Sequence, residues 1–274
     1  MNYRNWSLTP IIFLTLAGCA MTSSAPTAAV TAELRKEFAP SGTLIAATNY
    51  GNIVVAQRPA PGQDPQGVGP ELARELARRL GVPIKYVTYE VAGKVAEAAK
   101  DGAWDVAFLA VDPERTKVIG FSAPYLNIEG TYLVRQASPL RRLEDFDRAG
   151  LKIAVGDKTA YDLFLTRHLK QSTLVRYPTS QAAIDAYVAG QGDAAAGVKE
   201  ALAANAKKTP GLRVIDGAYM TIGQAVGVPI ARRNAQRYLH DFVEEMKANG
   251  FVSRALAASG NADATVAPAA SRPN

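Results

Sequence analysis

Short apolar runs alternate along the first half of the chain with stretches in which apolar residues recur every three or four positions. The clearest helical stretch begins at Pro70, carries leucines four residues apart and stops at Gly81. The run 105–111 is almost continuously apolar, which is typical of a strand buried on both faces of a sheet. The alternation indicates a mostly parallel sheet covered by helices. The predicted strands are 44–47, 84–87 and 105–111, and the predicted helices are 70–80 and 91–101.

A second series with the same alternation follows Ser138 and Pro139. Its first helix begins at Thr159, which is spaced from Asp162 as in a capping box. The last strand and the amphipathic helix after it are too little to fold alone, so we expect them to return to the first half of the chain. The predicted strands are 151–155, 174–176, 193–196 and 223–229, and the predicted helices are 159–170, 180–189 and 234–248.

The length of 274 residues suits two cores better than one, since cores of about 100 to 150 residues are usual. We therefore predict an α/β protein with two lobes. No internal stretch approaches the roughly 20 apolar residues that a membrane span needs. The segment 19–31 is small and polar and is predicted to be a flexible tether. The segment 259–274 is rich in Ala, Asn and Pro and is predicted to be disordered.

Residues 1–18 have the layout of an export signal, with Arg4 ahead of an apolar run and small residues before a cleavage point. The sequence LAGC that ends at Cys19 resembles the lipobox of bacterial lipoproteins, in which the cysteine becomes the lipid-modified first residue. This predicts a membrane anchor at Cys19; the alternative is an ordinary signal peptide with an incidental cysteine. Export to the periplasm is expected in both cases. Cys19 is the only cysteine, so neither an internal disulfide nor a thiolate metal site can form.

The formal net charge of +6 does not indicate nucleic-acid binding, because the basic residues are scattered as pairs among acidic neighbours. His168 and His240 fall on predicted helices with no Cys, Asp or Glu at ligand or triad spacing, and are expected to be surface residues. The chain also lacks a Gly-rich phosphate loop and an HExxH motif. We therefore predict no metal, no cofactor and no catalytic residues.

The sequence DPER at 112–115 has the chemistry of a helix start, with Asp112 suited to the N-cap. Arg115 opposes the helix dipole there by a few tenths of a kcal/mol or more. A guanidinium beside exposed helix amides favours a carboxylate, which can accept two hydrogen bonds from its fork. The turn follows a buried strand and so lies at the carboxyl edge of the sheet, where open α/β folds bind ligands. The alternative is that Arg115 is solvated or pairs with Glu114 or Asp112.

From about 42 to 255 the chain resembles the family 3 extracellular solute-binding proteins, the amino-acid-binding components of ABC importers. The resemblance rests on the order and spacing of several short stretches, none of which is specific alone. These are GVGPELARELARRL at 67–80 with Gly81 and Val82, GAWDV at 102–106, PER at 113–115, FSAPY at 121–125, SPL at 138–140 with LED at 143–145, and GDA at 192–194.

The resemblance implies a periplasmic-binding-protein clamshell in which each lobe is a mostly parallel sheet covered by helices. Lobe one would comprise 32–134 plus 223–258, and lobe two 137–220. Two crossing strands near 130–136 and 220–228 would form the hinge. A ligand in the cleft would contact both lobes and so stabilise the closed arrangement.

The same resemblance implies roles for individual residues. Arg115 would bind the ligand carboxylate, and backbone amides around Lys158, Thr159 and Ala160 would complete that contact. Tyr50 corresponds to an aromatic residue that packs on the ligand; the alternative is a half-buried core tyrosine.

Three positions depart from the family pattern. The family usually has two more residues, with Ser or Thr hydroxyls, between Asp105 and Arg115, whereas this chain has the hydroxyl-free run Phe108, Leu109, Ala110 and Val111. The acid that usually receives the ligand ammonium falls at Val198, followed by Lys199, and the second clamping aromatic falls near Ala92. Lys199 is either a ligand contact or a solvated lysine. Three polar residues could replace the missing acid or serve only in turns and hinge hydrogen bonds, namely Asn49, Asn52 and Glu129.

These features predict a monomeric, exported protein that captures a small carboxylate-bearing solute, an amino acid or a derivative, and delivers it to ABC permease subunits. One alternative is an enzyme resembling cyclohexadienyl dehydratase on the same fold, with Glu200 or Glu129 as its acid. Another is a ligand-sensing module that docks a membrane receptor. The predicted ligand contacts are Tyr50, Asn52, Ala110, Asp112, Arg115, Lys158, Thr159, Ala160, Val198 and Lys199.

Overall fold

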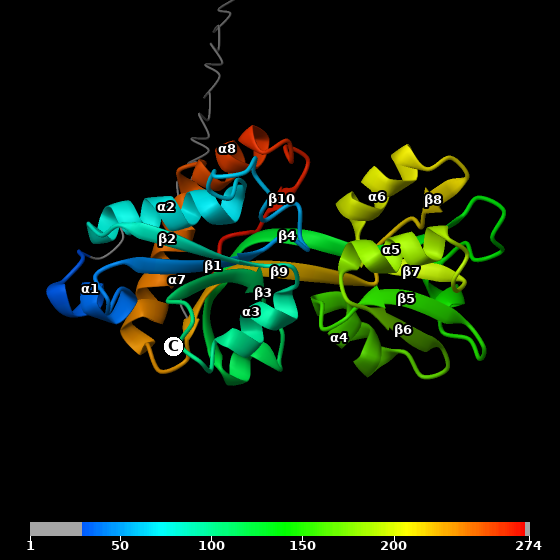
Figure 1. Cartoon of the computed structure of the whole chain (residues 1–274), viewed down its shortest axis with the longest axis horizontal. Coiled ribbons are helices and arrows are strands. Elements are labelled where there is room, and N and C mark those ends of the chain that lie inside the picture. The colour runs from blue at the N-terminus through cyan, green and yellow to red at the C-terminus, as the bar shows by residue number, and fades with distance from the viewer. Residues whose placement is uncertain (1–28, 272–274) are drawn as a thin grey trace, which may run out of the picture.

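The computed structural model describes residues 29–271, which form two lobes joined by two long strands (Figure 1). β4 (Ile119–Arg135) and β9 (Met220–Pro229) run antiparallel from one lobe into the other. Their pairing extends from Ile119 with Pro229 to Gly130 with Met220. The predicted two-lobed architecture and its two-strand hinge are therefore confirmed.

One sheet continues through both lobes, because the hinge strands belong to it. The strands outside the hinge are β1 (Leu44–Asn49), β2 (Ile84–Tyr89) and β3 (Val106–Ala110) in lobe one, and β5 (Lys152–Gly156), β6 (Thr173–Tyr177), β7 (Ala194–Val198) and β8 (Leu212–Val214) in lobe two. The strand order is β2-β1-β3-β9-β4-β7-β5-β6, and β8 pairs with β4. The pairs β1–β2, β1–β3, β5–β6 and β5–β7 are parallel, as the βαβ pattern predicts.

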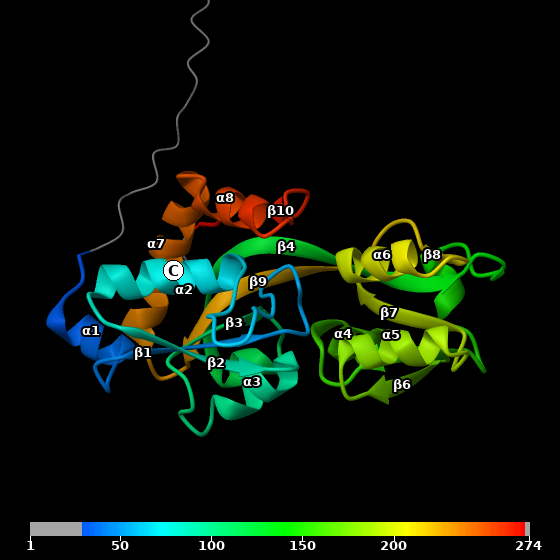
Figure 2. The same ribbon diagram turned by 45° about the horizontal axis from the view of Figure 1, so that its top comes forward.

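Helices cover both faces of the sheet in each lobe (Figure 2). They are α1 (Ala32–Phe38), α2 (Val68–Leu80), α3 (Ala92–Ala98), α7 (Arg233–Ala248) and α8 (Phe251–Ala258) in lobe one, and α4 (Ala160–His168), α5 (Ser180–Val188) and α6 (Lys199–Lys208) in lobe two. Leu72 of α2 and Phe108 belong to one hydrophobic cluster, whereas Val95 of α3 and Leu109 belong to another. Phe108 and Leu109 are neighbours in β3, so their side chains serve opposite faces of the sheet.

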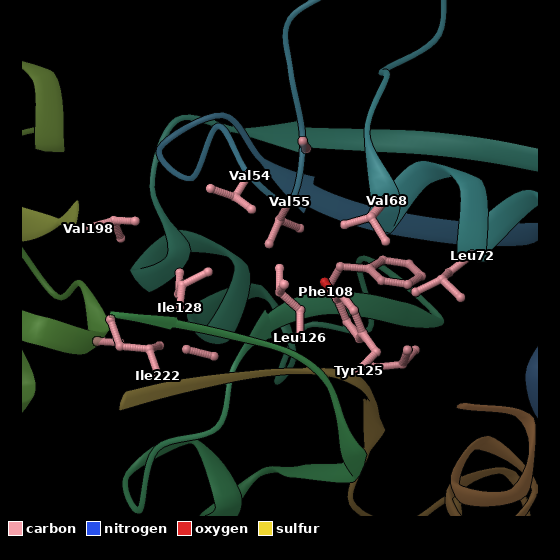
Figure 3. Packing of buried hydrophobic residues seen from close by; sticks show 14 of the residues in the cluster. Val54, Val55, Val68, Leu72, Phe108, Tyr125, Leu126, Ile128, Val198 and Ile222 are labelled. Atoms are coloured by element: carbon pink, nitrogen blue, oxygen red, sulfur yellow. The ribbon is translucent and has the colours of Figure 1, made fainter. Parts of the chain in front are cut away.

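The largest hydrophobic cluster crosses the hinge (Figure 3). It extends from Phe108 in lobe one past Ile128 and Ile222 on the hinge strands to Val198 in lobe two. Removal of such side chains from water contributes about 25 cal/mol per Å² of apolar surface. The hinge strands are thus anchored in both cores, which fixes where their polar side chains lie.

Helix α6 was not predicted from the sequence. Its composition favours a helix, since alanine and lysine are strong helix formers. It lacks the apolar spacing on which the other helices were predicted, because Leu202 is its one buried residue. It also begins at Lys199 directly after β7, with no loop between them to mark a start.

The segment 259–271 corrects two predictions, because it folds onto lobe one and is not disordered. β10 (Thr265–Val266) pairs with β4, and the Ala267 amide donates to the Tyr125 carbonyl at 3.2 Å. The Lys247 ammonium donates to the Pro268 carbonyl at 2.8 Å. His240, predicted at the surface, is buried beside this segment, with Nε2 3.2 Å from the Ser271 carbonyl oxygen. Main-chain pairing orders the segment, which its apolar content could not indicate.

The predicted export signal and Cys19 lie outside the described residues. So does most of the predicted tether, but its last residue, Thr31, is the N-cap of α1 and accepts a hydrogen bond from the Leu34 amide at 3.1 Å. Between residues 29 and 271, none of the helices combines the length and apolar character that a membrane crossing requires.

Removal of residues 262–274 should destabilise lobe one. The deletion removes the β10 pairing and one of the acceptors of the Lys247 ammonium, and each net hydrogen bond is worth about 1 kcal/mol. We expect the free energy of unfolding to fall by roughly 2 kcal/mol in a urea titration followed by circular dichroism. An unchanged midpoint would show that the segment contributes nothing to the fold.

Candidate ligand-binding site

A small cavity lies between the lobes, next to the hinge. Its polar lining residues are Asn49, Asn52, Arg115, Thr159, Tyr161, Ser180 and Gln224, and its other walls are Gly51, Val91, Ala92, Ala110, Ile128, Ala160, Val198 and Ile222. The volume of about 40 Å³ has room for no more than a few water molecules. The two lobes are therefore closed on each other, and a larger solute requires them to lie further apart.

Arg115 is the cation of this cavity. Its side chain is only 3% exposed, and its guanidinium donates to the Ala110 carbonyl at 3.0 Å and to the Lys158 carbonyl at 3.1 Å. Ala110 belongs to lobe one and Lys158 to lobe two, so one side chain connects both lobes. Burial lowers the pKa of Arg115 to about 10, which still leaves the guanidinium charged at neutral pH.

The predicted helix at 112–115 is wrong in length. The structure has only a 3₁₀ turn, Arg115–Lys117, before β4 begins at Ile119. The N-cap of this turn is Glu114 and not Asp112 as predicted, although the Asp112 carboxylate accepts from the Glu114 amide at 2.9 Å just before the turn. A single turn has little dipole, so Arg115 pays a smaller electrostatic cost than the sequence suggested.

The acids that were the alternative partners of Arg115 pair elsewhere. Asp112 forms an ion pair with Arg167 at 2.9 Å, and Glu114 forms one with Lys117 at 2.6 Å. Within residues 29–271, no carboxylate lies at ion-pair distance from Arg115. The guanidinium is therefore a buried cation without a direct ion pair, and the charge of Asp112 acts on its pKa only from a longer distance.

The start of α4 forms the opposite wall of the cavity. Thr159 is the N-cap: its hydroxyl accepts from the Asp162 amide at 3.1 Å and donates to the Gly156 carbonyl at 2.9 Å. The amides of Ala160 and Tyr161 precede the first intrahelical bond and have no acceptor in the described part of the chain. The free amides at this helix start suit an anion.

Two buried amide side chains complete the polar lining. Asn49, at the end of β1, and Gln224, in β9, are each 3% exposed, and neither side chain has a hydrogen-bond partner among the described residues. Gln224 is paired directly with Ala110 across β3 and β9. It also lies two residues from Ile222, so both side chains point to the face of β9 that lines the cavity.

Sequence reasoning missed three of the polar lining residues, namely Tyr161, Ser180 and Gln224. Gln224 could have been noticed as a lone amide in an apolar strand. The Tyr161 hydroxyl donates to the Ser180 hydroxyl at 2.9 Å, and burial raises the pKa of Tyr161. Their contact joins the starts of two helices that are distant in sequence, for which no local signal exists.

Among the predicted contacts, Asn52, Ala110, Arg115, Thr159, Ala160 and Val198 line the cavity. Tyr50 does not: the Arg58 guanidinium carbon lies 4.4 Å from its ring centre, which gives the ring a cation–π contact outside the cavity. Asp112 and Lys158 are adjacent to the cavity without lining it, although the Lys158 carbonyl reaches Arg115.

Lys199 lies beside a different cavity. Its ammonium forms an ion pair with Glu129 at 2.6 Å, and both residues line a second cavity of about 640 Å³ together with Glu200 and Asp263. Glu129 follows Ile128 in β4, so its side chain points to the opposite face of the hinge from the cavity of Arg115.

Contacts between the lobes surround the cavity of Arg115. The Lys158 ammonium of lobe two pairs with Glu97 of α3 at 2.5 Å, and the two lysines that flank Glu97 hold the pKa of its carboxyl well below the usual range. Lys158 has a left-handed backbone with a φ of 53°, which is uncommon outside glycine. A Cβ added at Gly93 would lie 2.6 Å from the Lys158 Cβ. The closed arrangement thus requires a glycine at position 93.

The described residues contain no group of three or more His, Cys, Asp or Glu side chains arranged to hold a metal ion. The cavity of Arg115 is lined by donors and by apolar walls, a set that suits an organic anion.

The fold and this cavity define a two-lobed α/β binding protein whose lobes meet around a cationic site. Residues 52–258 match the family described as bacterial extracellular solute-binding proteins, family 3, and the chain belongs to that family. No curated protein matches the chain.

Solved structures with a similar fold include amino-acid-binding proteins. A mutant of ArgBP from T. maritima has a TM-score of 0.72 at 22% identity, covering 83% of this chain and 99% of the other. An amino acid ABC transporter substrate-binding protein from Streptococcus pneumoniae, bound to L-arginine, has a TM-score of 0.72 at 20% identity, with 85% and 99% covered. The ancestral amino acid-binding protein AncCDT-1, a precursor of cyclohexadienyl dehydratase, has a TM-score of 0.70 at 22% identity, with 82% and 97% covered.

Substitution of Gly93 by alanine should prevent full closure of the lobes without harming either lobe. Gly93 lies in α3, where alanine favours the helix, but its Cβ would collide with Lys158 across the interface. We expect Gly93→Ala to keep its melting temperature and to show a larger radius of gyration in small-angle X-ray scattering.

The double variant Gly93→Ala with Lys158→Gly provides the matched control. Glycine removes the colliding Cβ and suits the left-handed backbone at position 158, and the lost ion pair with Glu97 is exposed and contributes little to stability. Closure should return in this variant. If Gly93→Ala has the scattering profile of the original chain, the contact does not limit closure.

Proposed function

We propose that this chain is an extracytoplasmic solute-binding protein of an ABC importer. It captures a small carboxylate-bearing solute between its lobes and delivers the solute to permease subunits. Its membership of an extracellular solute-binding family supports this role, as do fold neighbours named as amino acid transporter binding proteins. These neighbours are under 25% identical and carry only the fold, so the solute must be argued from the cavity.

The observation that carries the proposal is the burial of Arg115 in the cavity without an ion pair. A buried guanidinium has five N–H donors, and the protein supplies acceptors for two of them. A carboxylate would neutralise the charge and accept two further hydrogen bonds from the fork. The free amides of Ala160 and Tyr161 would meet the same anion from lobe two.

The position of these groups links binding to closure. Arg115 belongs to lobe one and the start of α4 to lobe two, so a carboxylate held by both is bound best when the lobes are closed. In this proposal Asn52, Ala110, Thr159 and Val198 complete the pocket around the solute. Asp112 and Lys158 act through their ion pairs with Arg167 and Glu97, which favour the same closed arrangement.

The positions of the candidate catalytic acids favour a binding protein over an enzyme. A dehydratase on this fold would need an acid in the cavity that holds the carboxylate. Glu129 and Glu200, the sequence candidates for that acid, line the second cavity. Turnover of prephenate or arogenate by the purified chain would contradict the binding role.

Export and anchoring are also part of the proposal. A receiving permease lies in a membrane, so its binding protein should be held close to it. The lipobox-like LAGC sequence supports a periplasmic, monomeric protein attached to a membrane through a lipid on Cys19. Metabolic labelling with a palmitate analogue, lost in Cys19→Ala, would test the anchor.

A screen for thermal shifts tests the carboxylate site. Small carboxylates, amino acids included, should contain at least one that raises the melting temperature in a saturable way; a ligand at 100 times its dissociation constant adds about 2.7 kcal/mol. Arg115→Met keeps the length of the side chain and removes its charge, so the shift should disappear while the unliganded protein stays folded.

Arg254→Met, on the exposed face of α8, is the matched control and should retain the shift. A shift that survives in Arg115→Met would show that Arg115 does not bind the solute.

A further inference from the structure

The cavity of Arg115 contains one charged group and no acid. Among its lining residues, all of which lie in the described part of the chain, Arg115 is the sole charged side chain. Its volume is small and three of its walls are alanines, which leaves little room for water to screen a charge. The formal charge of the solute must therefore match the single positive charge of the site.

Five acids on the surrounding elements form ion pairs, whereas Asp157 and Glu200 form none among the described residues and do not line the cavity either. These pairs are Asp112 with Arg167, Glu97 with Lys158, Asp162 with Arg176, Glu90 with Arg58 and Glu129 with Lys199. None of these acids lines the cavity. An ammonium group of a bound solute would thus find no carboxylate.

The charge balance separates three classes of carboxylate. An amino-acid zwitterion with Arg115 leaves one uncompensated positive charge when the lobes close, and a dicarboxylate leaves one negative charge. A monocarboxylate without an ammonium group leaves none. Burial of an unpaired charge is among the most expensive events in a protein interior, so the neutral combination is favoured.

The unpartnered amides indicate what else the solute carries. Asn49 and Gln224 are buried in the lining and lack partners within the described residues, and each offers an NH₂ group that can donate to a neutral oxygen. Both side chains border the cavity, so a solute there could accept hydrogen bonds from their amides. Gln224 pairs with Ala110, whose carbonyl holds Arg115, so this donor lies close to the carboxylate position.

We propose, on the basis of the proposed function, that the solute is a small monocarboxylate whose second carbon carries an oxo or hydroxyl oxygen in place of an ammonium group. Its carboxylate binds Arg115 and the start of α4. Its second oxygen accepts hydrogen bonds from the side-chain amides of Gln224 and Asn49. The small apolar walls formed by Ala92, Ala110 and Ala160 limit the remainder of the solute to a short chain.

Isothermal titration of the purified full chain with matched acids tests this assignment. Pyruvate, lactate, alanine and propionate share a three-carbon skeleton and differ only at the second carbon, and malonate adds a second carboxylate. We expect pyruvate or lactate to bind at least tenfold more tightly than alanine and malonate. Alanine binding as tightly as both would overturn the inference while leaving a carboxylate site intact.

The failure of the proposed function has a different signature. If none of these acids nor longer homologues binds, or if binding is the same in Arg115→Met, the carboxylate site itself is wrong and both proposals are overturned.

Gln224→Glu tests the role of the amide directly. The substitution is nearly isosteric and adds the missing acid, so the ratio of alanine affinity to lactate affinity should rise at least tenfold. Gln136→Glu makes the same charge change at an exposed position after β4 and should leave the ratio unchanged. An unchanged ratio in Gln224→Glu would overturn the assignment of Gln224.

Because a glutamate at 224 can itself pair with Arg115 and block every acid, Gln224→Met is the second variant. It removes the donor, keeps the charge of Arg115 and should weaken lactate and pyruvate while leaving propionate unchanged. Equal losses for all three acids would contradict a contact to the second oxygen.

Discussion

The charge of Arg115 is the constraint around which the two lobes are arranged. Its guanidinium lies at the carboxyl end of β3, removed from water and without an ion pair to any described carboxylate. Two backbone carbonyls, one from each lobe, replace part of its hydration. A buried cation held by neutral dipoles alone is costly, and its depressed pKa is one expression of that cost. The closed protein therefore favours the binding of an anion next to Arg115.

The hinge links this preference for an anion to the motion of the two lobes. β4 and β9 belong to the sheets of both lobes, and their apolar side chains are packed in a cluster that includes residues of both cores. The same strands carry Gln224 and Ile222 into the cavity. Lobe motion must therefore pivot beside the polar groups that contact a solute. A rotation at the hinge moves the start of α4 relative to Arg115, while Gln224 and Arg115 keep their relation through the pairing of Gln224 with Ala110.

Much of the fold could be predicted because its signals are local. The leucines of α2, the apolar run of β3 and the cap at Thr159 are each specified within a few residues, and the structure contains all three elements. Arg115 could be found for the same reason, since a cation in a turn after a buried strand is unusual. Its turn is nevertheless short, because β4 begins at Ile119 and ends the helical geometry.

The remaining parts of the site depend on contacts between distant segments. Tyr50 stacks with Arg58 outside the cavity. The position of its ring depends on the path of the loop after β1, which the residue type does not indicate. Gln224 gains its role from its register against β3, and the segment 259–271 is ordered by pairing with β4. Neither register nor pairing is encoded within a short window of sequence.

The ion pairs between the lobes add a second level of control. Asp112 is almost fully buried, and Arg167 of lobe two is its partner, so opening the lobes exposes a carboxylate that closure must desolvate again. Such a pair contributes little net energy but makes the closed geometry specific, because a misaligned closure would leave a buried acid unpaired.

The stability of the closed arrangement and the affinity for the solute are linked. The more the ion pairs favour closure in the absence of solute, the less binding energy is needed to close the lobes. Control of closure and binding of the solute belong to different places, since the ion pairs lie around the cavity and Arg115, which has no ion pair, lies inside it. Solute charge can thus decide which molecules are retained, while the surrounding pairs decide how readily the lobes close on them.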